Sequence, residues 1–258
     1  MKFTILITSY NKGKYLKKCI HSCLNQNKSD YEIILCDNYS NDGTTTILTE
    51  FENKIKIIKK RRVSKYAPVN QMDLIQEGLH ISKGDYICLL DGDDYFYSDK
   101  LKTLEKYLNI NKNLNIIFDL PEIKKDHNLT QLKLKKKYQK NIWPTIVNTS
   151  SISIKKDFLK NFFQKKLFEN FNLLEIDFRL NVYSRCIDKK FLIIQDKMTV
   201  YRYVEGSIIN SIKRFSKLWW IKRLQAHEYM SFIFKINNLN YKYSIDWFFT
   251  KIFSILLK

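Results

Sequence analysis

The most chemically distinctive pattern in the chain is a set of three carboxylates within four residues. Asp91, Asp93 and Asp94 directly follow the apolar run Tyr86–Leu90. Carboxylates this close repel one another unless a cation neutralises them, and their oxygens suit the hard ions Mg²⁺ and Mn²⁺. Such an ion could in turn neutralise the phosphates of a nucleotide diphosphate. The alternative is an acidic turn that begins a helix.

The segments around this cluster alternate between strand and helix patterns. Short apolar runs predict strands over 3–8, 31–36, 55–58, 86–90 and 116–118. Helical spacing predicts helices over 15–25, 42–51, 72–81 and from about residue 98. Strands without polar alternation, each followed by a helix, predict an α/β fold with a mostly parallel sheet covered on both faces.

Polar residues follow three of these strands, at Thr8–Asn11, Asp37–Gly43 and Asp91–Asp94. Open α/β sheets bind ligands at the carboxyl ends of their strands, so we expect the three clusters to form one site. The second half of the chain is less regular. Its strand patterns cover 152–154, 191–194 and 200–203, and its helical patterns cover 156–163, 176–183 and the segment from 211 onward.

Three blocks of the sequence resemble those of the family-2 glycosyltransferases of the GT-A fold. The blocks are Ile5–Asn11, Asp37–Thr44 and Lys83–Asp94, in the family's order and spacing. The resemblance implies a Rossmann-like, mostly parallel sheet flanked by helices. It also implies an inverting enzyme that moves a sugar from a nucleotide-sugar, with UDP expected, to a glycan or lipid-linked glycan. Bacterial members make surface polysaccharides, including lipopolysaccharide.

The resemblance suggests how the chain is organised. We expect a GT-A catalytic domain over 1–210, in which 1–119 bind the nucleotide-sugar and 120–210 bind the acceptor. A basic, aromatic helical extension over 211–258 follows. Aromatic residues among lysines suit a helix on an anionic membrane surface. The alternative is a helix pair packed on the catalytic domain or on a second subunit, as in a homodimer.

The first two blocks imply contacts with the nucleoside. By the resemblance, Thr8 and Tyr10 lie along the base and ribose, and Asp37 and Asn38 contact the base. The family usually has a second carboxylate where this chain has Asn38, whose amide offers a donor as well as an acceptor. Asp37 and Asn38 could instead serve only the turn after their strand.

The third block and a later segment imply contacts with the diphosphate. Asp93 is the expected ligand of Mn²⁺ or Mg²⁺, and Asp91 lies nearer the ribose or a metal-bound water. Arg202 lies in a segment that resembles the family's late Y-R-x-H-x-x-S motif, ending at Ser207. Its planar guanidinium suits a diphosphate. Val204 replaces the usual His, and a surface arginine at a strand end is the alternative.

The segment Leu174–Phe178 resembles the family's motif for the catalytic base. In the register that aligns its apolar-Asp-aromatic end, Glu175 is the base that takes the acceptor's proton and Asp177 orients the site. A shifted register makes Asp177 the base. Both could instead only stabilise a helix N-terminus. Trp143 and Ser150 fall where the family builds part of its acceptor wall, or else they belong to a strand edge.

Composition limits the remaining classes. The chain has 45 Lys and Arg against 26 Asp and Glu, a net charge of +19, which suits anionic partners in general or reflects base composition. No nucleic-acid recognition signature is present, so we expect no nucleic acid partner. A nucleotidyltransferase would normally carry a glycine-rich phosphate-binding loop near the first strand, and Ser9–Gly13 matches such a loop poorly. A further alternative is an inactive relative that acts as a scaffold, because Asn38, Leu174 and Val204 depart from the family's pattern. Five cysteines without a C-x-x-C pair and no membrane-length apolar run predict a cytoplasmic protein, or one peripheral on the inner face of the cytoplasmic membrane.

Overall fold

The computed structural model describes residues 2–136, 143–144, 148–165, 170–187, 189–204 and 212–256. Its strands are β1 (Phe3–Ser9), β2 (Tyr31–Asp37), β3 (Lys56–Lys59), β4 (Tyr86–Asp91), β5 (Tyr95–Phe96), β6 (Ile116–Asp119), β7 (Glu122–Lys125), β8 (Asn128–Gln131), β9 (Ile152–Lys155), β10 (Phe191–Ile194) and β11 (Thr199–Arg202). Its helices are α1 (Gly13–Leu24), α2 (Thr44–Thr49), α3 (Ala67–Ile81), α4 (Lys100–Ile110), α6 (Lys156–Gln164), α7 (Ile176–Ile187), α8 (Lys217–Ile236) and α9 (Ile245–Leu256), with a 3₁₀ turn at Thr149–Ser151.

A large mixed sheet forms the centre of the molecule. Its order is β10-β6-β9-β4-β1-β2-β3, and every pairing is parallel except those of β9 with β4 and β6. The α/β fold with a mostly parallel sheet is therefore confirmed. A smaller sheet, β5-β11-β7-β8, contains three short strands that the sequence analysis did not predict. Their segments, such as the E-I-K-K of β7, carry too few apolar residues to form a strand pattern.

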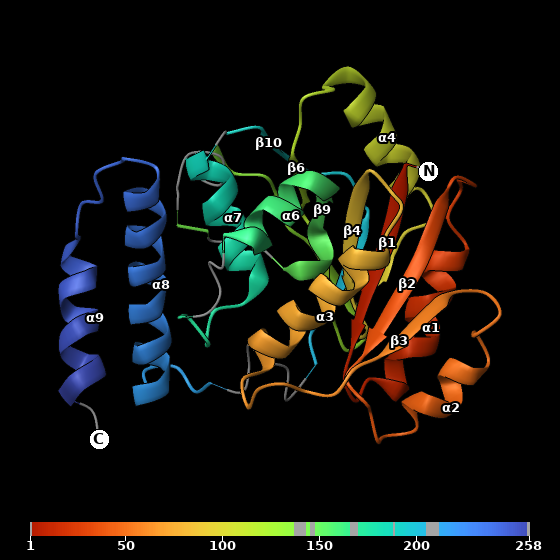
Figure 1. Ribbon diagram of the computed structural model, residues 1–258, viewed down its shortest axis with the longest axis horizontal. Coiled ribbons are helices and arrows are strands. Elements are labelled where there is room, and N and C mark those ends of the chain that lie inside the picture. The colour runs from red at the N-terminus through yellow and green to blue at the C-terminus, as the bar shows by residue number, and fades with distance from the viewer. Residues whose placement is uncertain are drawn as a thin grey trace.

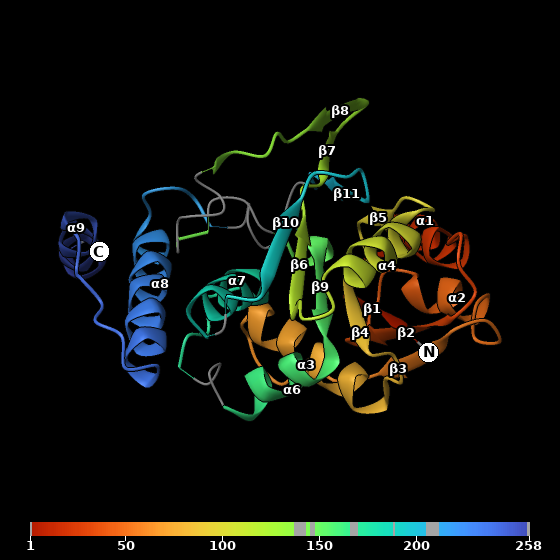
Figure 2. The ribbon, with the colours of Figure 1, turned by 90° about the horizontal axis from the view of Figure 1, so that it is seen from above.

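Helices cover both faces of the large sheet (Figures 1 and 2). The side chains of β1 alternate between two buried clusters: Leu6 packs on the α3 side with Ile75, whereas Ile5 and Ile7 pack on the α1 side with Leu16. Because successive side chains of a strand point to opposite faces, an uninterrupted apolar strand needs helices on both. The continuous apolar runs of β1, β2 and β4 follow from this requirement.

The loops after β1 and β2 are tied together at the carboxyl edge of the sheet. Asp42, predicted to begin the second helix, accepts hydrogen bonds from the backbone N–H of Thr44 at 3.3 Å and from its hydroxyl at 2.5 Å. The same carboxylate accepts from the first residue of α1, Gly13, at 2.9 Å. Gly43 precedes α2 with φ of +85°, a left-handed conformation that glycine adopts without a steric penalty.

The extension from residue 211 contains the two helices α8 and α9, which confirms the predicted helical C-terminal extension. Residues of α8, including Tyr229 and Ile233, belong to the same buried cluster as α3 and α7, and the Tyr229 hydroxyl donates to the Arg179 carbonyl at 3.0 Å. Helix α9 packs against α8 at the end of the molecule farthest from α2 (Figure 1). Within the described residues, no helix combines the length and apolarity that crossing a membrane requires.

Candidate active site

A cleft of about 380 Å³ lies at the carboxyl edge of β1, β2 and β4. The predicted site residues that line it are Thr8, Tyr10, Asn38, Asp91, Asp93, Glu175, Asp177 and Arg202. Segments separated by more than 150 residues thus contribute to one cleft. Three other predicted residues, Asp37, Trp143 and Ser150, are not part of its lining.

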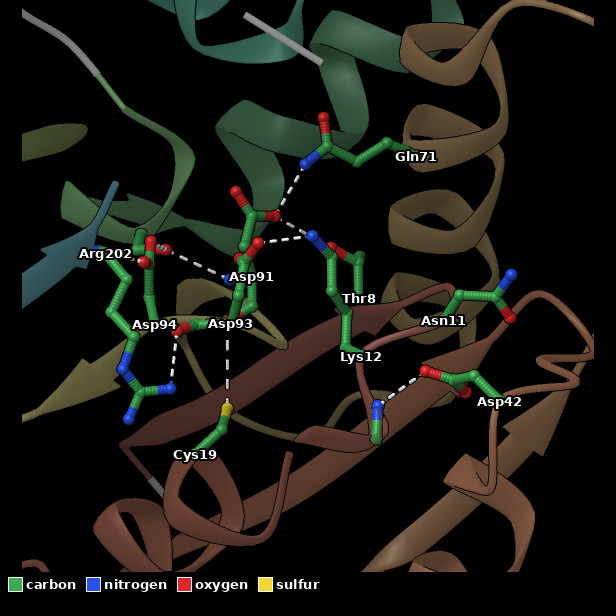
Figure 3. Close-up of polar contacts among 12 residues, drawn as sticks. Thr8, Asn11, Lys12, Cys19, Asp42, Gln71, Asp91, Asp93, Asp94 and Arg202 are labelled. Atoms are coloured by element: carbon green, nitrogen blue, oxygen red, sulfur yellow. Dashed lines mark hydrogen bonds and ion pairs between the residues drawn. The ribbon is translucent and has the colours of Figure 1, made fainter. Parts of the chain in front are cut away.

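Asp91 is held at the end of β4 by three neighbours (Figure 3). Its Oδ1 accepts hydrogen bonds from the Thr8 hydroxyl at 3.0 Å and from Gln71 Nε2 at 2.6 Å. Its backbone N–H donates to the Ser150 hydroxyl at 3.0 Å. Burial and the nearby charge of Asp93 raise the pKa of Asp91 to about 6. Thr8 therefore serves to orient this carboxylate as well as to line the cleft.

Asp93 forms an ion pair with the ammonium of Lys12. Burial lowers the pKa of Lys12, but attraction by Asp93, Asp91 and Asp94 outweighs that effect and raises it above its ordinary value. A cationic side chain thus neutralises the carboxylate cluster, as the repulsion among three carboxylates requires. This pairing shows that the cluster is built to be balanced by a positive charge.

The carboxylates also fit a divalent ion. Among the described residues, no three His, Cys, Asp or Glu side chains are arranged to hold a metal. Mg²⁺, however, is commonly held by one or two carboxylates together with substrate phosphates and water. Asp91 and Asp93 both line the cleft and supply oxygen ligands of that kind. Lys12 would have to release Asp93 for the ion to bind there.

Asp94 and Ser150 lie beneath the cleft and support it. Asp94 is fully buried and accepts from the Ser150 hydroxyl at 2.6 Å and from the Arg202 backbone N–H at 2.8 Å. Burial and the charges of Asp93 and Asp91 raise the pKa of Asp94 well above its ordinary value. Ser150 is also fully buried, so its hydroxyl orients Asp91 and Asp94 and does not reach an acceptor in the cleft.

A buried lysine, Lys100, holds the segment that carries Ser150. Lys100 is 0% exposed, and its ammonium donates to Asp119 at 2.7 Å, to the Thr199 hydroxyl at 2.7 Å and to the Ser150 carbonyl at 3.2 Å. Removing one partner of a buried ion pair leaves an uncompensated charge and costs roughly 3–5 kcal/mol. This network therefore fixes the position of Ser150.

Of the residues predicted to bind the base, Asn38 lines the cleft and Asp37 does not. Asp37 is 0% exposed and accepts from the Ser40 N–H at 2.8 Å and its hydroxyl at 2.6 Å. Asn38 lines the cleft and donates through Nδ2 to the Lys60 carbonyl at 3.1 Å. Tyr10 is 39% exposed. Asp37 thus serves the turn after β2, whereas Asn38 and Tyr10 face the cleft.

Arg202 is held over the acidic loop between two tyrosines. Its Nη1 donates to the Asp93 carbonyl at 2.8 Å, and its guanidinium carbon lies 5.2 Å and 4.8 Å from the ring centroids of Tyr15 and Tyr95. The guanidinium is therefore oriented before any ligand binds. Val204 ends the described part of this segment, and the predicted Ser207 lies outside the described residues.

We expect Arg202→Ala to weaken binding of the nucleotide-sugar about 10- to 100-fold, the effect of losing hydrogen bonds between a cation and a phosphate. Arg202→Lys should recover only part of the affinity, because an ammonium lacks the planar fork. Calorimetric titration of the donor measures both. Arg61→Ala removes an arginine outside the cleft lining and serves as the control. Unchanged affinity in Arg202→Ala would exclude Arg202 from diphosphate binding.

Glu175 and Asp177 both line the cleft and differ in their partners. Glu175 forms an ion pair with the ammonium of Lys222 on α8. Asp177 is 8% exposed and accepts from the Phe178 N–H at 2.5 Å. Burial and the charge of Glu175 raise the pKa of Asp177 to about 8. Asp177 is therefore mostly protonated at neutral pH, whereas Glu175 is the member of the pair that contacts the Lys222 ammonium.

The raised pKa of Asp177 predicts a pH-dependent stability. A carboxyl group whose pKa is higher in the folded state stabilises the fold at low pH, and this contribution is lost as the pH rises toward 8. Asp177→Asn cannot ionise, so its melting temperature should exceed that of the wild type increasingly between pH 5 and pH 8, by several degrees. Asp157→Asn, an exposed first-turn aspartate of α6, is the control. A difference that does not change with pH would contradict the prediction.

Other residues of the site were not predicted from the sequence. Lys12 adjoins the first polar cluster and could have been included on that ground. Gln71 comes from α3, and Arg62 comes from the loop after β3 and lies 4.5 Å from the ring centroid of Tyr10. Lys222 was assigned only to a basic tail. Trp143, in contrast, packs against Phe178 on α7 and His227 and Arg223 on α8.

The fold with this cleft is the GT-A fold. The crystal structure of S. aureus TarS 1–349 in complex with UDP-GlcNAc matches 98% of this chain and 70% of that chain with a TM-score of 0.68 at 14% identity. The mannosyltransferase PcManGT from Pyrobaculum calidifontis, in complex with GDP-Man and Mn²⁺, matches 99% of this chain and 70% of that chain with a TM-score of 0.58 at 14% identity.

Residues 4–175 match the model of glycosyl transferase family 2, and the chain belongs to this family. It is 34% identical over 105 residues to a poly(ribitol-phosphate) beta-glucosyltransferase of Bacillus spizizenii, covering 39% of this chain and 16% of that protein. It is 28% identical over 243 residues to an uncharacterized glycosyltransferase of Methanocaldococcus jannaschii, covering 87% of this chain and 78% of that protein. The chain spans only 16% to 40% of the length of the first three curated relatives it matches.

Proposed function

We propose that this protein is an inverting glycosyltransferase that moves a sugar from a UDP-sugar to a hydroxyl of a glycan or lipid-linked glycan. The observation that carries the proposal is the convergence of Asp93, Arg202 and Glu175 in one cleft. They supply, respectively, a metal ligand, a diphosphate ligand and a proton acceptor. These are the groups that transfer from a nucleotide-sugar requires.

The nucleoside half of the cleft suits uridine. The Asn38 amide donates to the Lys60 carbonyl, so its oxygen is the end that can face a ligand. A carbonyl oxygen accepts from the N3–H of uracil, whereas neutral cytosine has no proton at that position. Tyr10 offers an aromatic face to the base, and Arg62 already lies against that ring. Thr8 and Asp91 would then shape the wall around the ribose, and buried Asp37, predicted to contact the base, would instead hold the turn after β2.

The diphosphate half is the acidic loop with Arg202. Mn²⁺ or Mg²⁺ bound to Asp93, with Asp91 nearby, would neutralise charge on the diphosphate leaving group. Arg202 would donate two hydrogen bonds to phosphate oxygens from its fixed position. Lys12, released from Asp93, would lie beside the same phosphates and add a second positive charge.

The reaction itself needs one proton acceptor. The acceptor hydroxyl gives its proton to the Glu175 carboxylate while its oxygen forms a bond to the anomeric carbon. The bond between that carbon and the diphosphate oxygen breaks on the opposite side, which inverts the configuration and releases UDP. Asp177, protonated at neutral pH, can donate a hydrogen bond to the sugar or the acceptor. Lys222 holds Glu175 in place.

We propose the predicted division of the chain, with catalytic residues in 1–210 and an extension over 211–258 that contributes Lys222. Some relatives are named for poly(ribitol-phosphate), a polymer rich in phosphate. The net charge of +19 would favour an acceptor of that anionic kind. Trp143, which packs beside α7, would then act on the acceptor side through packing, whereas buried Ser150 would orient Asp91 and Asp94.

A thermal-shift panel of UDP-, GDP-, CMP- and dTDP-sugars, with and without Mn²⁺, tests the proposal. Ligands that bind only the folded state raise its melting temperature, so the largest shift is expected for a UDP-sugar with Mn²⁺. Slow release of UDP in the absence of acceptor, with water attacking the sugar, should accompany it. No metal-dependent shift with any donor would overturn the proposal. Binding without UDP release would favour an inactive scaffold.

A further inference from the structure

Helix α9 buries polar residues and exposes most of its large apolar residues. Its buried residues are Thr250 and Ser254, which face α8. The Thr250 hydroxyl is buried and has no hydrogen-bond partner among the described residues. Most of the large apolar residues of the same helix are exposed instead, and only Trp247 and Ile252 are half-buried. A helix that only completes the protein's core would place its apolar stripe inward.

The exposed apolar residues form one continuous face. They are 37% to 77% exposed, and they are Ile245, Phe248, Phe249, Phe253, Ile255 and Leu256. At about 100° per residue, these positions fall within an arc of roughly 160° around the helix axis. Contiguous apolar surface of this kind marks a site of contact with a partner or a membrane. Figure 2 shows α9 outermost, with α8 between it and the rest of the chain.

Residues 212–256, which carry this face, contain eight basic residues and two acidic ones, and of the basic ones Lys222 and Arg223 are paired with acids. The single carboxylate of α9, Asp246, is paired with Arg223 at 2.7 Å and bonded to His227 at 2.9 Å on α8, so it lies on the inner side. Residues 212–256 contain one other acid, Glu228. Their basic residues are Lys213, Arg214, Lys217, Lys222, Arg223, Lys235, Lys242 and Lys251.

We propose that the outer face of α9 docks on an anionic lipid surface. A second copy of the chain would bring two equally basic segments together, whereas anionic headgroups attract them. Where α8 begins, Phe215 and Leu218 are exposed beside Lys213, Arg214 and Lys217, and the stacking of Trp220 on Phe253 places this turn next to the end of α9. Apolar and basic side chains therefore alternate along one rim.

The dimensions of α9 suit a helix that lies in the membrane interface. Its 12 residues extend about 18 Å, which is shorter than the ~30 Å hydrocarbon core. Helix α8 contacts α9 and also reaches Glu175 through Lys222. The cleft would thus lie within about two helix diameters, ~20 Å, of the headgroups. That proximity suits a lipid-linked acceptor. This consequence rests on the proposed function, whereas the docking of α9 on lipid is independent of it.

Vesicle sedimentation of the full chain tests the proposal. We expect binding to vesicles of phosphatidylglycerol and phosphatidylcholine, weaker binding at high salt, and little binding to phosphatidylcholine alone. The double variant Phe248→Gln/Ile255→Gln should bind at least about tenfold more weakly, because it removes two apolar side chains from the face. Both residues are exposed, so circular dichroism should show an unchanged fold.

The matched control is Ile110→Gln/Leu129→Gln, which removes two exposed apolar residues on α4 and β8 and should bind vesicles as the wild type does. Two outcomes would overturn the proposal. One is equal vesicle binding by both double variants. The other is a concentration-dependent dimer, seen by analytical ultracentrifugation without lipid, that Phe248→Gln/Ile255→Gln dissociates. Donor binding in the thermal-shift panel would be unaffected by either outcome.

Discussion

Glu175→Gln is expected to lower sugar transfer by about 10²- to 10⁴-fold, the usual contribution of a general base. Glutamine keeps the size of the side chain but cannot take the acceptor's proton. Nucleotide-sugar binding should stay within about twofold, because Glu175 is not among the proposed ligands of the nucleoside or the diphosphate. UDP release under saturating donor measures the first effect, and calorimetric titration measures the second. Activity at the wild-type level would show that Glu175 is not the base.

Asp177→Asn is the companion variant that distinguishes the two carboxyl groups. Because the pKa of Asp177 is raised to about 8, this group is mostly protonated at neutral pH, and an amide reproduces its neutral form. We expect Asp177→Asn to keep a much larger share of activity at pH 7 than Glu175→Gln. If Asp177 were the base, its variant would be the inactive one, and the wild-type rate would rise with pH to a midpoint near 8.

Asp93→Asn is expected to lower transfer by about 10²- to 10³-fold, as removal of a main electrostatic contact at a developing charge does. The Mn²⁺-dependent part of the thermal shift should disappear with it, since an amide is a weak ligand for a hard cation. Thermal shift with UDP-sugar and Mn²⁺, together with UDP release, measures both effects. A full metal-dependent shift in Asp93→Asn would place the ion elsewhere.

Lys12→Met is the control for this experiment, because Asp93 also pairs with Lys12. The variant removes the ion pair and keeps the carboxylate. If Asp93 acts as a metal ligand, Lys12→Met should retain the Mn²⁺-dependent shift and bind the metal at least as tightly, since the competing ammonium is gone. Loss of the shift in both variants would mean that the ion pair, and not metal binding, is what Asp93 provides.

The fold could be predicted from the sequence where burial leaves a simple pattern. Strands β1, β2 and β4 are buried on both faces, so each contains an uninterrupted apolar run, at Ile5–Ile7, Ile33–Cys36 and Tyr86–Leu90. Three strands of the small sheet, β5, β7 and β8, carry no such pattern, because they are short and partly exposed. Secondary-structure patterns report burial, and they are weakest where burial is partial.

The sequence alone determined which groups meet in the cleft from the ends of the strands. Carboxyl ends of parallel strands share one edge of the sheet, so Thr8, Asn38 and Asp91 had to lie together. The order of the chain shows which residues follow each strand and therefore lie at that edge. It does not show whether a side chain there faces the cleft or is buried, so only the tertiary structure revealed that Asp37 and Ser150 are buried.

Only the tertiary structure decided which distant side chains complete the site and which face of α9 remains exposed. Gln71 and Arg62 line the cleft and Lys222 reaches Glu175 because α3, the loop after β3 and α8 pack where they do, and no local pattern encodes those contacts. Helix α9 has apolar residues on one face and Thr250 and Ser254 on the other. Periodicity shows that the two faces differ, but only packing against α8 shows that the polar face is buried.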